Sequence, residues 1–378
     1  MASIGPKDLV HFFDKRLNDR AEWVICLVIV DAAAGVVTTQ PTPEELERAQ
    51  HRAADRASAA SAPITPGALA DGTPVPLLAN LGKPEGAAEA VALGAEGVGL
   101  FRTEFLFLSA NQAPTVEQQR ESYTQLLAAF PGKKVVVRVL DAGADKPLAF
   151  LNDAHEENPA LGLRGIRALR ASEDILREQL TALAEADAAT EADLWVMAPM
   201  VATVEETEYF VEIARDYGIK TAGVMVEVPS SALLADRILV DADFASIGTN
   251  DLTQYTLAAD RLLGSVAAFQ DPWHPAVLRL IREVGDAGRI HGKPVGICGE
   301  AAADPLLAVV LVGLGATSLS MAPTALADVR ASLLQHSLDD ARVIAEAALA
   351  ANGAASAREA ARAAATTTHE AAHAAVQS

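Results

Sequence analysis

GVGLFRTEF (residues 97–105) carries the clearest fold signal in the chain, because an apolar run ends there in an arginine and a glutamate. Four later stretches have the same form, an apolar run that ends in polar or ionisable residues: VVVRVLD (135–141), VMVEVP (224–229), SIGTND (246–251) and PVGICGE (294–300). In a parallel α/β barrel the carboxyl ends of all strands share one rim, where catalytic groups collect. The pattern therefore predicts a barrel with a site on this rim.

Strand-like segments alternate with amphipathic helical patterns along most of the chain. This alternation predicts an α/β fold, a (β/α)8 TIM barrel with a short N-terminal extension and a linker helix. An open doubly wound sheet also fits the periodicity, but no glycine-rich dinucleotide fingerprint opens a first strand–helix unit. The eight predicted strands cover residues 75–80, 97–102, 134–140, 194–200, 223–228, 244–248, 294–298 and 317–321.

The segments outside the barrel have patterns of their own. A helical pattern at residues 7–17 precedes a strand-like run at 23–30, and Thr42 is positioned to open the linker helix. The tail is rich in alanine and carries too few large apolar side chains to pack firmly. The predicted segments are a small N-terminal unit, a linker helix with a loop, the barrel and the tail, at residues 1–40, 41–73, 74–345 and 346–378.

The composition excludes several classes of function. The 378 residues carry a formal charge of −20, which argues against nonspecific nucleic-acid binding because that requires a basic surface. The two cysteines, Cys26 and Cys298, form no disulfide framework and fit a reducing cytosol. The longest apolar run, at 23–30, is too short to span a bilayer, and no signal cleavage site is evident. We therefore expect a cytoplasmic protein with neither membrane nor nucleic-acid partners.

Several arginines lie in or beside apolar runs. Arg102 and Arg138 occupy the ends of two predicted strands, where an unpaired guanidinium is costly. One interpretation pairs them with neighbouring carboxylates such as Glu104. The favoured interpretation is a clamp for phosphate and carboxylate groups, because arginine presents planar bidentate donors that suit both. Arg261, after the Asn-Asp turn, and Arg164, in the long loop after residue 141, would complete this clamp.

Two carboxylates are candidate metal ligands. Glu227 lies in an apolar strand, and Asp251 follows the turn at the end of the next predicted strand. Adjacent barrel strands would bring them together, and Mg²⁺ is typically bound by one or two carboxylates with substrate and water oxygens. The alternative is a structural salt bridge to Arg102 or Arg261. A pair of carboxylates without histidine gives no case for zinc.

Cys298 follows a strand and is flanked by Gly299 and Glu300. A single cysteine is more often a small buried apolar residue, but a position on the rim favours a function. A thiol with the ordinary pKa of ~8.5 is mostly protonated at neutral pH and could donate a proton to carbon. Cys26, within an apolar run, is predicted to be a core residue.

These motifs together resemble a known family. The chain resembles the phosphoenolpyruvate-binding barrel of Enzyme I of the bacterial sugar phosphotransferase system, the phosphoenolpyruvate–protein phosphotransferases, from about Val36 to Gly353. Pyruvate phosphate dikinase and phosphoenolpyruvate synthase share the barrel, but the segment QYTLAADR (254–261) is more similar to Enzyme I. The motifs that carry the resemblance are GVGLFRTEFLFL (97–108), VVVRVLDAGADKP (135–147), ENPALGLRGIR (157–167), GVMVEVPSSAL (223–233), SIGTNDLTQYTLAADR (246–261) and GICGEAAADP (296–305).

The resemblance implies a role for each rim residue. Glu227 and Asp251 would bind Mg²⁺, and Cys298 would donate the proton that converts enolpyruvate into pyruvate. The residues that would bind phosphoenolpyruvate are Arg102, Arg138, Arg164, Asn250, Asp251 and Arg261. The implied reaction is Mg²⁺-dependent phosphoryl transfer to a histidine, by an enzyme that forms a homodimer and serves the carrier protein HPr in sugar transport.

The sequence departs from the family in one respect. The phosphorylated histidine of the family lies in a preceding domain, in a Gly-Gly-x-x-Ser-His context that does not occur here. Residues 30–50 resemble the end of that domain, so residues 1–40 are interpreted as its remnant. We therefore expect the phosphoacceptor domain to come from elsewhere. The alternatives are a non-catalytic phosphoenolpyruvate-binding dimerisation module, an enzyme like pyruvate phosphate dikinase or phosphoenolpyruvate synthase, and an enzyme that acts on pyruvate-like acids by enolate chemistry.

Overall fold

The computed structural model describes residues 9–14, 24–31, 36–108, 113–143, 148 and 156–377. These residues form two compact units that separate between Pro63 and Ile64. Among the described residues, no helix is both long and apolar enough to cross a membrane.

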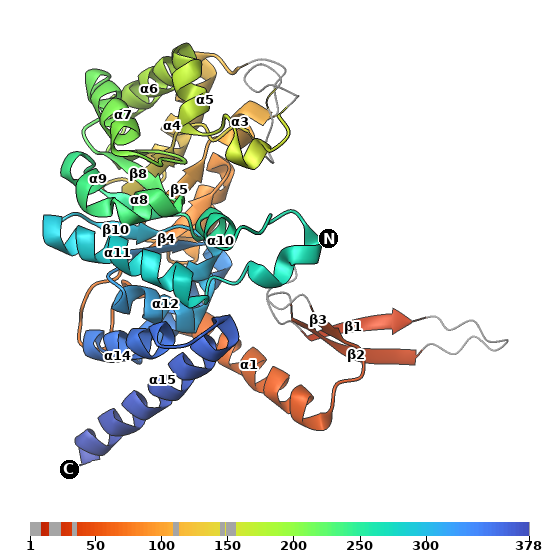
Figure 1. Cartoon of the computed structure of the whole chain (residues 1–378). Coiled ribbons are helices and arrows are strands. Elements are labelled where there is room, and N and C mark those ends of the chain that lie inside the picture. The colour runs from red at the N-terminus through yellow and green to blue at the C-terminus, as the bar shows by residue number, and fades with distance from the viewer. Residues whose placement is uncertain are drawn as a thin grey trace. The chain divides into compact units, whose positions relative to one another are not determined.

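The first unit contains a three-stranded antiparallel sheet, with β1 (Leu9–Asp14), β2 (Val24–Asp31) and β3 (Val36–Thr38) in that order (Figure 1). β2 confirms the strand predicted at residues 23–30. The helix predicted at residues 7–17 was wrong for residues 9–14, the part of it that the structure describes, because β1 pairs with β2 along its whole length. A β-type run such as LVHFF accepts this pairing readily, and the hydrogen bonds to a partner strand outweigh a local helical periodicity.

The linker helix predicted after Thr42 is α1 (Pro43–Ser61). Thr42 accepts a hydrogen bond from the backbone N–H of Glu45, and the Glu45 side chain accepts one from the backbone N–H of Thr42. This reciprocal capping satisfies amides that the first helical turn leaves unpaired. The described part of Cys26 is its backbone in β2, so its predicted burial lies outside the described side chains.

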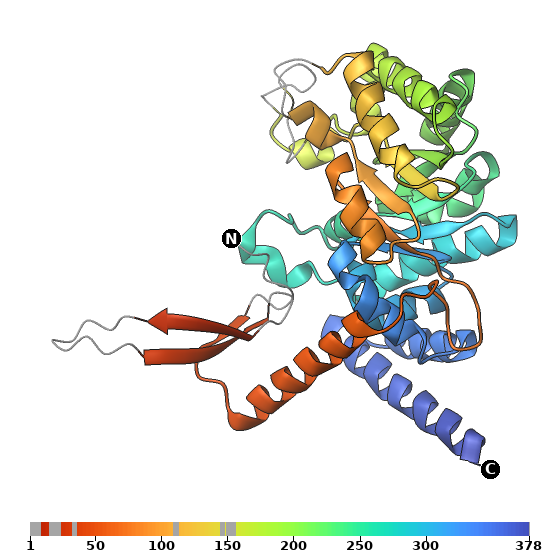
Figure 2. The ribbon, with the colours of Figure 1, turned by 180° about the vertical axis from the view of Figure 1, so that it is seen from behind.

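The second unit is a closed barrel of eight parallel strands (Figures 1 and 2). Each of the eight predicted strands is present, and β10 pairs with both β9 and β11, while β11 pairs with β4 and closes the barrel. This confirms the TIM barrel prediction. The strands are β4 (Leu77–Leu81), β5 (Val98–Arg102), β6 (Lys134–Arg138), β7 (Asp193–Ala198), β8 (Ala222–Val226), β9 (Ala245–Ile247), β10 (Val295–Ile297) and β11 (Ser318–Met321).

Helices surround these strands, and several begin with a threonine or serine cap of the kind that opens α1. The α-helices are α2 (Ala87–Ala92), α3 (Glu104–Leu108), α4 (Val116–Ala128), α5 (Ile166–Ala171), α6 (Glu173–Ala188), α7 (Val204–Asp216), α8 (Pro229–Leu233), α9 (Ala235–Asp241), α10 (Thr249–Leu257), α11 (Pro275–His291), α12 (Pro305–Gly313), α13 (Leu326–Leu333), α14 (Leu338–Leu349) and α15 (Ala354–Gln377). The 3₁₀ turns are η1 (Pro84–Gly86), η2 (Pro159–Leu161), η3 (Gly264–Phe269), η4 (Glu300–Ala303) and η5 (Pro323–Ala325).

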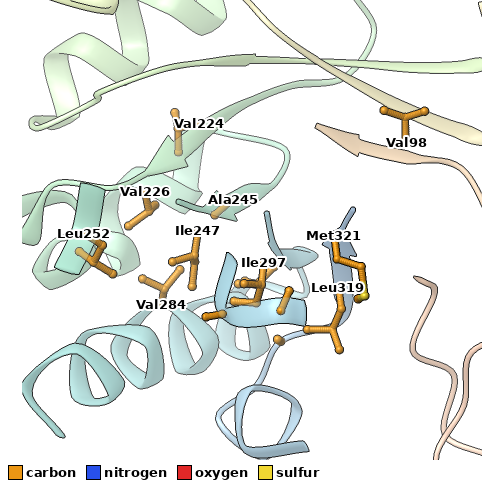
Figure 3. Close-up of a cluster of buried hydrophobic side chains, with 14 of the residues drawn as sticks. Val98, Val224, Val226, Ala245, Ile247, Leu252, Val284, Ile297, Leu319 and Met321 are labelled. Atoms are coloured by element: carbon orange, nitrogen blue, oxygen red, sulfur yellow. The ribbon is translucent and has the colours of Figure 1, made fainter. Parts of the chain in front are cut away.

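The strands contribute to two separate apolar layers. Val135 and Val137 of β6 belong to the outer layer between strands and helices, whereas Val136 belongs to the inner layer with Met197 and Met225. Successive side chains of a strand point to opposite faces, so one sequence supplies both layers. Figure 3 shows part of the outer layer, where apolar side chains of β8 to β11 meet those of α10 and α11.

The C-terminal tail packs more firmly than its composition predicted. Ala357 and Ala361 of α15 are fully buried and belong to the outer core. Small alanine side chains let a helix approach its neighbours closely, so few large residues are needed. Arg358 adds an ion pair to Asp271 at 3.3 Å and lies over the ring of Trp273. The prediction of a loosely packed tail was therefore wrong for the start of α15.

Ala258 ends α10 in the left-handed conformation, with φ of 50°. This conformation lets the chain turn back so that the backbone N–H of Arg261 reaches the side chain of Gln254 at 2.8 Å. A residue with a Cβ atom adopts it at a cost of ~1–2 kcal/mol, whereas glycine adopts it freely.

Ala258→Gly should therefore raise the free energy of unfolding by ~0.5–1 kcal/mol, after allowance for the greater freedom of glycine in the unfolded chain. Thermal or denaturant unfolding measures this change. The matched control is Ala363→Gly, at an exposed position inside α15, which should lower stability by ~1 kcal/mol. Destabilisation by both substitutions would contradict the prediction.

Candidate functional site

The inward-facing positions of the strands end in ionisable groups at the C-terminal rim. Arg138 follows Val136 by two positions, and Glu227 follows Met225 by two positions. Both therefore continue the inner face of the barrel. Cys298 follows β10 in the same way and is itself part of the inner layer. The alternation of side chains along the strands thus explains why ionisable groups lie at the rim that the sequence predicted.

Arg138 lies at the centre of a buried charge network. Its side chain is only 5% exposed, and Nη2 donates a hydrogen bond to Glu104 at the start of α3. Nη1 lies 3.1 Å from Asp141 and 4.0 Å from Glu227. Burial opposes the charge of this guanidinium, but Glu104, Asp141 and Glu227 outweigh that effect and raise the pKa of Arg138 above its ordinary value. The structure therefore shows the pairing with carboxylates that one interpretation of Arg138 predicted. The clamp for phosphate and carboxylate groups stays a prediction.

Arg164 comes from the loop between η2 and α5 and is also buried. Its guanidinium lies between two carboxylates, 3.4 Å from Asp141 and 3.4 Å from Asp251. Gly165 allows this arrangement, because its φ of 57° and its close approach to Met200 leave no room for a Cβ atom. The loop is thereby tied to the ends of β6 and β7.

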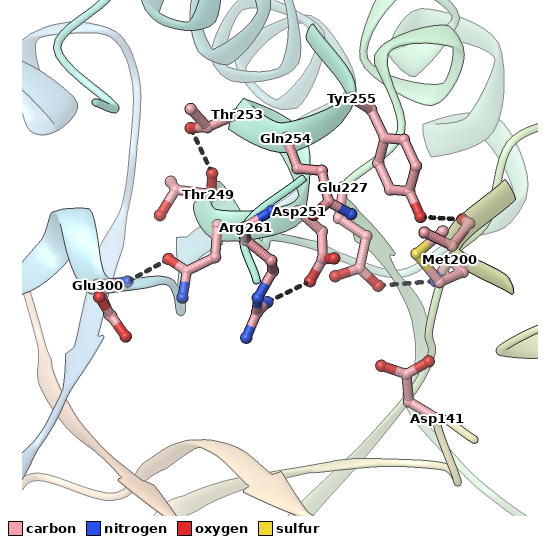
Figure 4. Close-up of polar contacts among 12 residues, drawn as sticks. Asp141, Met200, Glu227, Thr249, Asp251, Thr253, Gln254, Tyr255, Arg261 and Glu300 are labelled. Atoms are coloured by element: carbon pink, nitrogen blue, oxygen red, sulfur yellow. Dashed lines mark hydrogen bonds and ion pairs between the residues drawn. The ribbon is translucent and has the colours of Figure 1, made fainter. Parts of the chain in front are cut away.

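Asp251 lies in the first turn of α10 and connects two arginines. Oδ1 is 3.4 Å from Arg164. Oδ2 is 3.1 Å from Arg261, a contact that Figure 4 shows. The position at a helix N-terminus also favours a negative charge. Asn250, its neighbour, accepts a hydrogen bond from the backbone N–H of Glu300 at 3.1 Å. The Asn250 amide group therefore links the loops after β9 and β10.

Glu227 receives a backbone hydrogen bond in addition to its 4.0 Å ion pair with Arg138. Oε1 accepts a hydrogen bond from the backbone N–H of Met200 at 2.8 Å, while Oε2 is buried and accepts no hydrogen bond from the described residues. Met200 has φ of 57°, a conformation that costs a non-glycine residue ~1–3 kcal/mol and that recurs at functional sites. Gly248 leaves space for the carboxylate, since a Cβ atom there would lie 2.7 Å from Oε2.

Glu227 and Asp251 face each other (Figure 4). Burial, followed by the negative charge of Asp251, raises the pKa of Glu227 to about 8. A cation between the two carboxylates would relieve this repulsion and give a close partner to Oε2, which accepts no hydrogen bond from the described residues, so these residues fit Mg²⁺. In the described part of the chain, no group of three or more His, Cys, Asp or Glu side chains could hold an ion. Substrate and water oxygens would therefore complete the coordination, as Mg²⁺ commonly requires.

Cys298 is a free, buried thiol. Its S–H group donates to the carbonyl oxygen of Ile247 at 3.5 Å. Burial raises the pKa of Cys298 to about 11, and the charge of Glu227 adds to this effect. The thiol is therefore protonated at neutral pH and can act as a proton donor, whereas it is a poor nucleophile.

Arg102 differs from the other rim arginines. It is half-buried at the end of β5, where its backbone pairs with that of Arg138. Among the described residues, its side chain makes no hydrogen bond or ion pair. Of the four arginines named from the sequence, three share carboxylates on the rim, and Arg102 keeps its donors available for an anion. Arg167 and Arg170 lie on the outside, against Glu206 and the ring of Tyr209 respectively.

Comparison with known proteins identifies the family of the chain. Residues 44–338 match the family model of the PEP-utilising enzymes, PEP-binding domain, where PEP is phosphoenolpyruvate. The chain belongs to the PEP-utilising enzymes. It is 52% identical to the phosphoenolpyruvate-protein phosphotransferase of Streptomyces coelicolor over 340 residues, which cover 89% of this chain and 61% of that protein.

Other relatives of this PEP-utilising domain are similar. The phosphoenolpyruvate-protein phosphotransferase of Geobacillus stearothermophilus is 41% identical over 85% of this chain and 58% of its own length. A multiphosphoryl transfer protein of Xanthomonas campestris is 42% identical over 85% of this chain and 39% of its own length. The chain thus spans about three fifths or less of the curated relatives that it matches.

Two residues of the site were not singled out from the sequence. Met200 was predicted as the end of a strand, and its role depends on a backbone conformation that no motif reveals. Tyr255 lies within the quoted segment QYTLAADR, but its hydroxyl group accepts a hydrogen bond from Arg164 at 3.1 Å across 91 positions of the chain. The polar residues that follow the Asn-Asp turn were the sequence feature that could have pointed to Tyr255.

The raised pKa of Glu227 predicts a dependence of stability on pH. The folded chain holds the Glu227 proton more tightly than the unfolded chain, so the associated stabilisation is present at low pH and is lost as the pH rises through about 8. With metal removed by EDTA, the Tm of the wild type should fall between about pH 5 and 8 more steeply than that of Glu227→Gln, which cannot titrate. Parallel Tm curves for the two proteins would contradict the prediction.

Proposed function

We propose that this PEP-utilising domain catalyses the half-reaction of a phosphoenolpyruvate–protein phosphotransferase, in which a phosphoryl group passes from phosphoenolpyruvate to a histidine. The observation that supports it most strongly is the arrangement around Asp251, where one carboxylate is shared by Arg164 and Arg261 and faces Glu227. Arginines suited to a phosphate and a carboxylate, beside a carboxylate pair suited to Mg²⁺, match a small and highly anionic substrate.

The arginines would bind the two anionic ends of phosphoenolpyruvate. Arg102 has its donors available, while Arg138 and Arg164 are held in place by buried carboxylates before the substrate arrives. Groups that are already positioned need little reorganisation as charge moves during phosphoryl transfer. Asn250 would contribute through its amide nitrogen, because its oxygen already binds the Glu300 backbone.

Glu227 and Asp251 would hold Mg²⁺, which neutralises charge on the phosphoryl and enolate oxygens when bound. The phosphoryl group would leave the enol oxygen of phosphoenolpyruvate and bond to a nitrogen of the acceptor histidine. Cys298 would then donate its proton to the methylene carbon of enolpyruvate, which yields pyruvate. Its raised pKa supports this role, because the group must carry a proton at neutral pH.

The partners of the reaction belong to the same proposal. The acceptor would be a histidine-bearing domain, and HPr would receive the phosphoryl group from it in the sugar phosphotransferase system. The names of the curated relatives, phosphoenolpyruvate-protein phosphotransferase and multiphosphoryl transfer protein, support phosphoryl transfer to a protein. We further propose a homodimer in the cytoplasm.

Calorimetry tests the proposal directly. Oxalate, a mimic of enolpyruvate, should bind the chain in the presence of Mg²⁺ and should not bind with EDTA. A separately supplied histidine-bearing domain should then become phosphorylated from phosphoenolpyruvate. Binding without any phosphate transfer would instead support the non-catalytic module, and absence of binding in both conditions would overturn the proposal.

Asp251→Asn should weaken Mg²⁺-dependent oxalate binding by about 100-fold, because it removes the charge that the metal and two arginines share. The matched control is Asp243→Asn. Asp243 precedes β9 at its opposite end and also lies near two cations, 3.4 Å from Arg215 and 3.8 Å from Lys293. Oxalate affinity should be unchanged in this control, and an equal loss in both variants would contradict the assignment of Asp251.

Cys298→Ala should leave oxalate affinity within about threefold of the wild type while slowing proton transfer to enolpyruvate by about 100-fold. Exchange of the pyruvate methyl protons for deuterium, followed by NMR in the presence of Mg²⁺, measures that step without an acceptor histidine. An unchanged exchange rate would exclude Cys298 as the proton donor.

A further inference from the structure

Tyr255 lies beside the rim, although it carries none of the charges described above. It is half-buried on α10, and its hydroxyl group makes two hydrogen bonds to the loop that follows β6. The hydroxyl donates to the carbonyl oxygen of Ala160 in η2 and accepts a hydrogen bond from Arg164 Nη1 at 3.1 Å. Figure 4 shows this hydroxyl on the side of the site where Met200 lies. One phenol therefore holds both the backbone of η2 and a side chain of the site.

The other partners of Arg164 carry negative charge. Nη2 lies 3.4 Å from Asp141, and Nη1 lies 3.4 Å from Asp251. An anionic substrate would compete with both carboxylates for this guanidinium. A cation held by Asp251 would also compete with Arg164 for the same oxygens. The neutral hydroxyl of Tyr255 competes with neither ligand, so this contact can persist when the charged partners exchange.

Hydrogen bonds of the backbone also hold the loop that carries Arg164. On the downstream side of Arg164, Gly165 N–H donates to Ala142 at 3.1 Å and Ile166 N–H donates to Pro199 at 3.3 Å. On the upstream side, the bond from Tyr255 to Ala160 ties the loop to α10, four positions before Arg164. The backbone is thus fixed on both sides of Arg164, and Tyr255 supplies a contact on the upstream side.

We propose that Tyr255 is a positioning residue, whose neutral hydroxyl keeps the Arg164 guanidinium directed at the anionic substrate while the carboxylates of the rim change partners. This inference rests on the proposed function of the site. It assigns to Tyr255 no contact with the reacting atoms.

Tyr255→Phe tests the proposal, since it removes the hydroxyl and keeps the ring. Mg²⁺-dependent oxalate binding, measured by calorimetry, should become about tenfold weaker, the usual effect of losing a hydrogen bond to a charged group. The matched control is Tyr217→Phe. The Tyr217 hydroxyl also accepts a hydrogen bond from an arginine, Arg177 Nη1, at 3.1 Å, but on the outer surface. Oxalate affinity should be unchanged in Tyr217→Phe.

A double-mutant cycle separates positioning from a structural role. If Tyr255 acts through Arg164, Tyr255→Phe should cause no further loss of oxalate affinity in an Arg164→Ala background. Equal losses in both backgrounds, or unchanged affinity in Tyr255→Phe, would overturn the proposal alone. Failure of the wild-type chain to bind oxalate would instead overturn the proposed function, and this inference with it.

Discussion

Closure of the sheet constrains every inward-facing side chain of the eight strands. Such a side chain must either fill the interior of the barrel or emerge at one of its ends. Val136 and Met225 fill the interior, and the next inward positions, Arg138 and Glu227, reach the C-terminal rim. Water is available there on one side only. The strand alternation that packs the core therefore also gathers the charged groups of the site.

Charges gathered in this way must be paired, because an isolated buried charge is costly. Arg138 and Arg164 share Asp141, and Arg164 and Arg261 share Asp251. These pairs hold the guanidinium groups in position without fully saturating them. Glu227 is the exception, because its hydrogen bond comes from the backbone N–H of Met200 and its nearest guanidinium, that of Arg138, is 4.0 Å away. Burial and the charge of Asp251 raise the pKa of Glu227, so the arginines do not fully balance its negative charge. An anion and a cation that enter together would restore that balance.

Much of the fold could be predicted because the relevant signals are local. An apolar run of three to five residues that ends in Arg102 or Arg138 identifies a parallel strand and its end, and threonine caps identify helix starts. The failures have a common cause, which is packing between distant segments. Pairing with β2 made a strand of the predicted helix at 7–17, and contacts of Ala357 and Ala361 with the core made a packed helix of the tail.

The eight strands could be read from the amino-acid sequence, and so could the end of the barrel that carries the site and the types of residue there. Each of these follows from local periodicity and from the alternation of side chains along a strand. Which side chains and backbone groups contact one another at the site depends on the tertiary structure. The bond from Met200 to Glu227 and the bonds from Tyr255 to Ala160 and Arg164 join loops that are far apart in the chain. Those distances depend on left-handed backbone conformations and close loop approaches that no local pattern specifies.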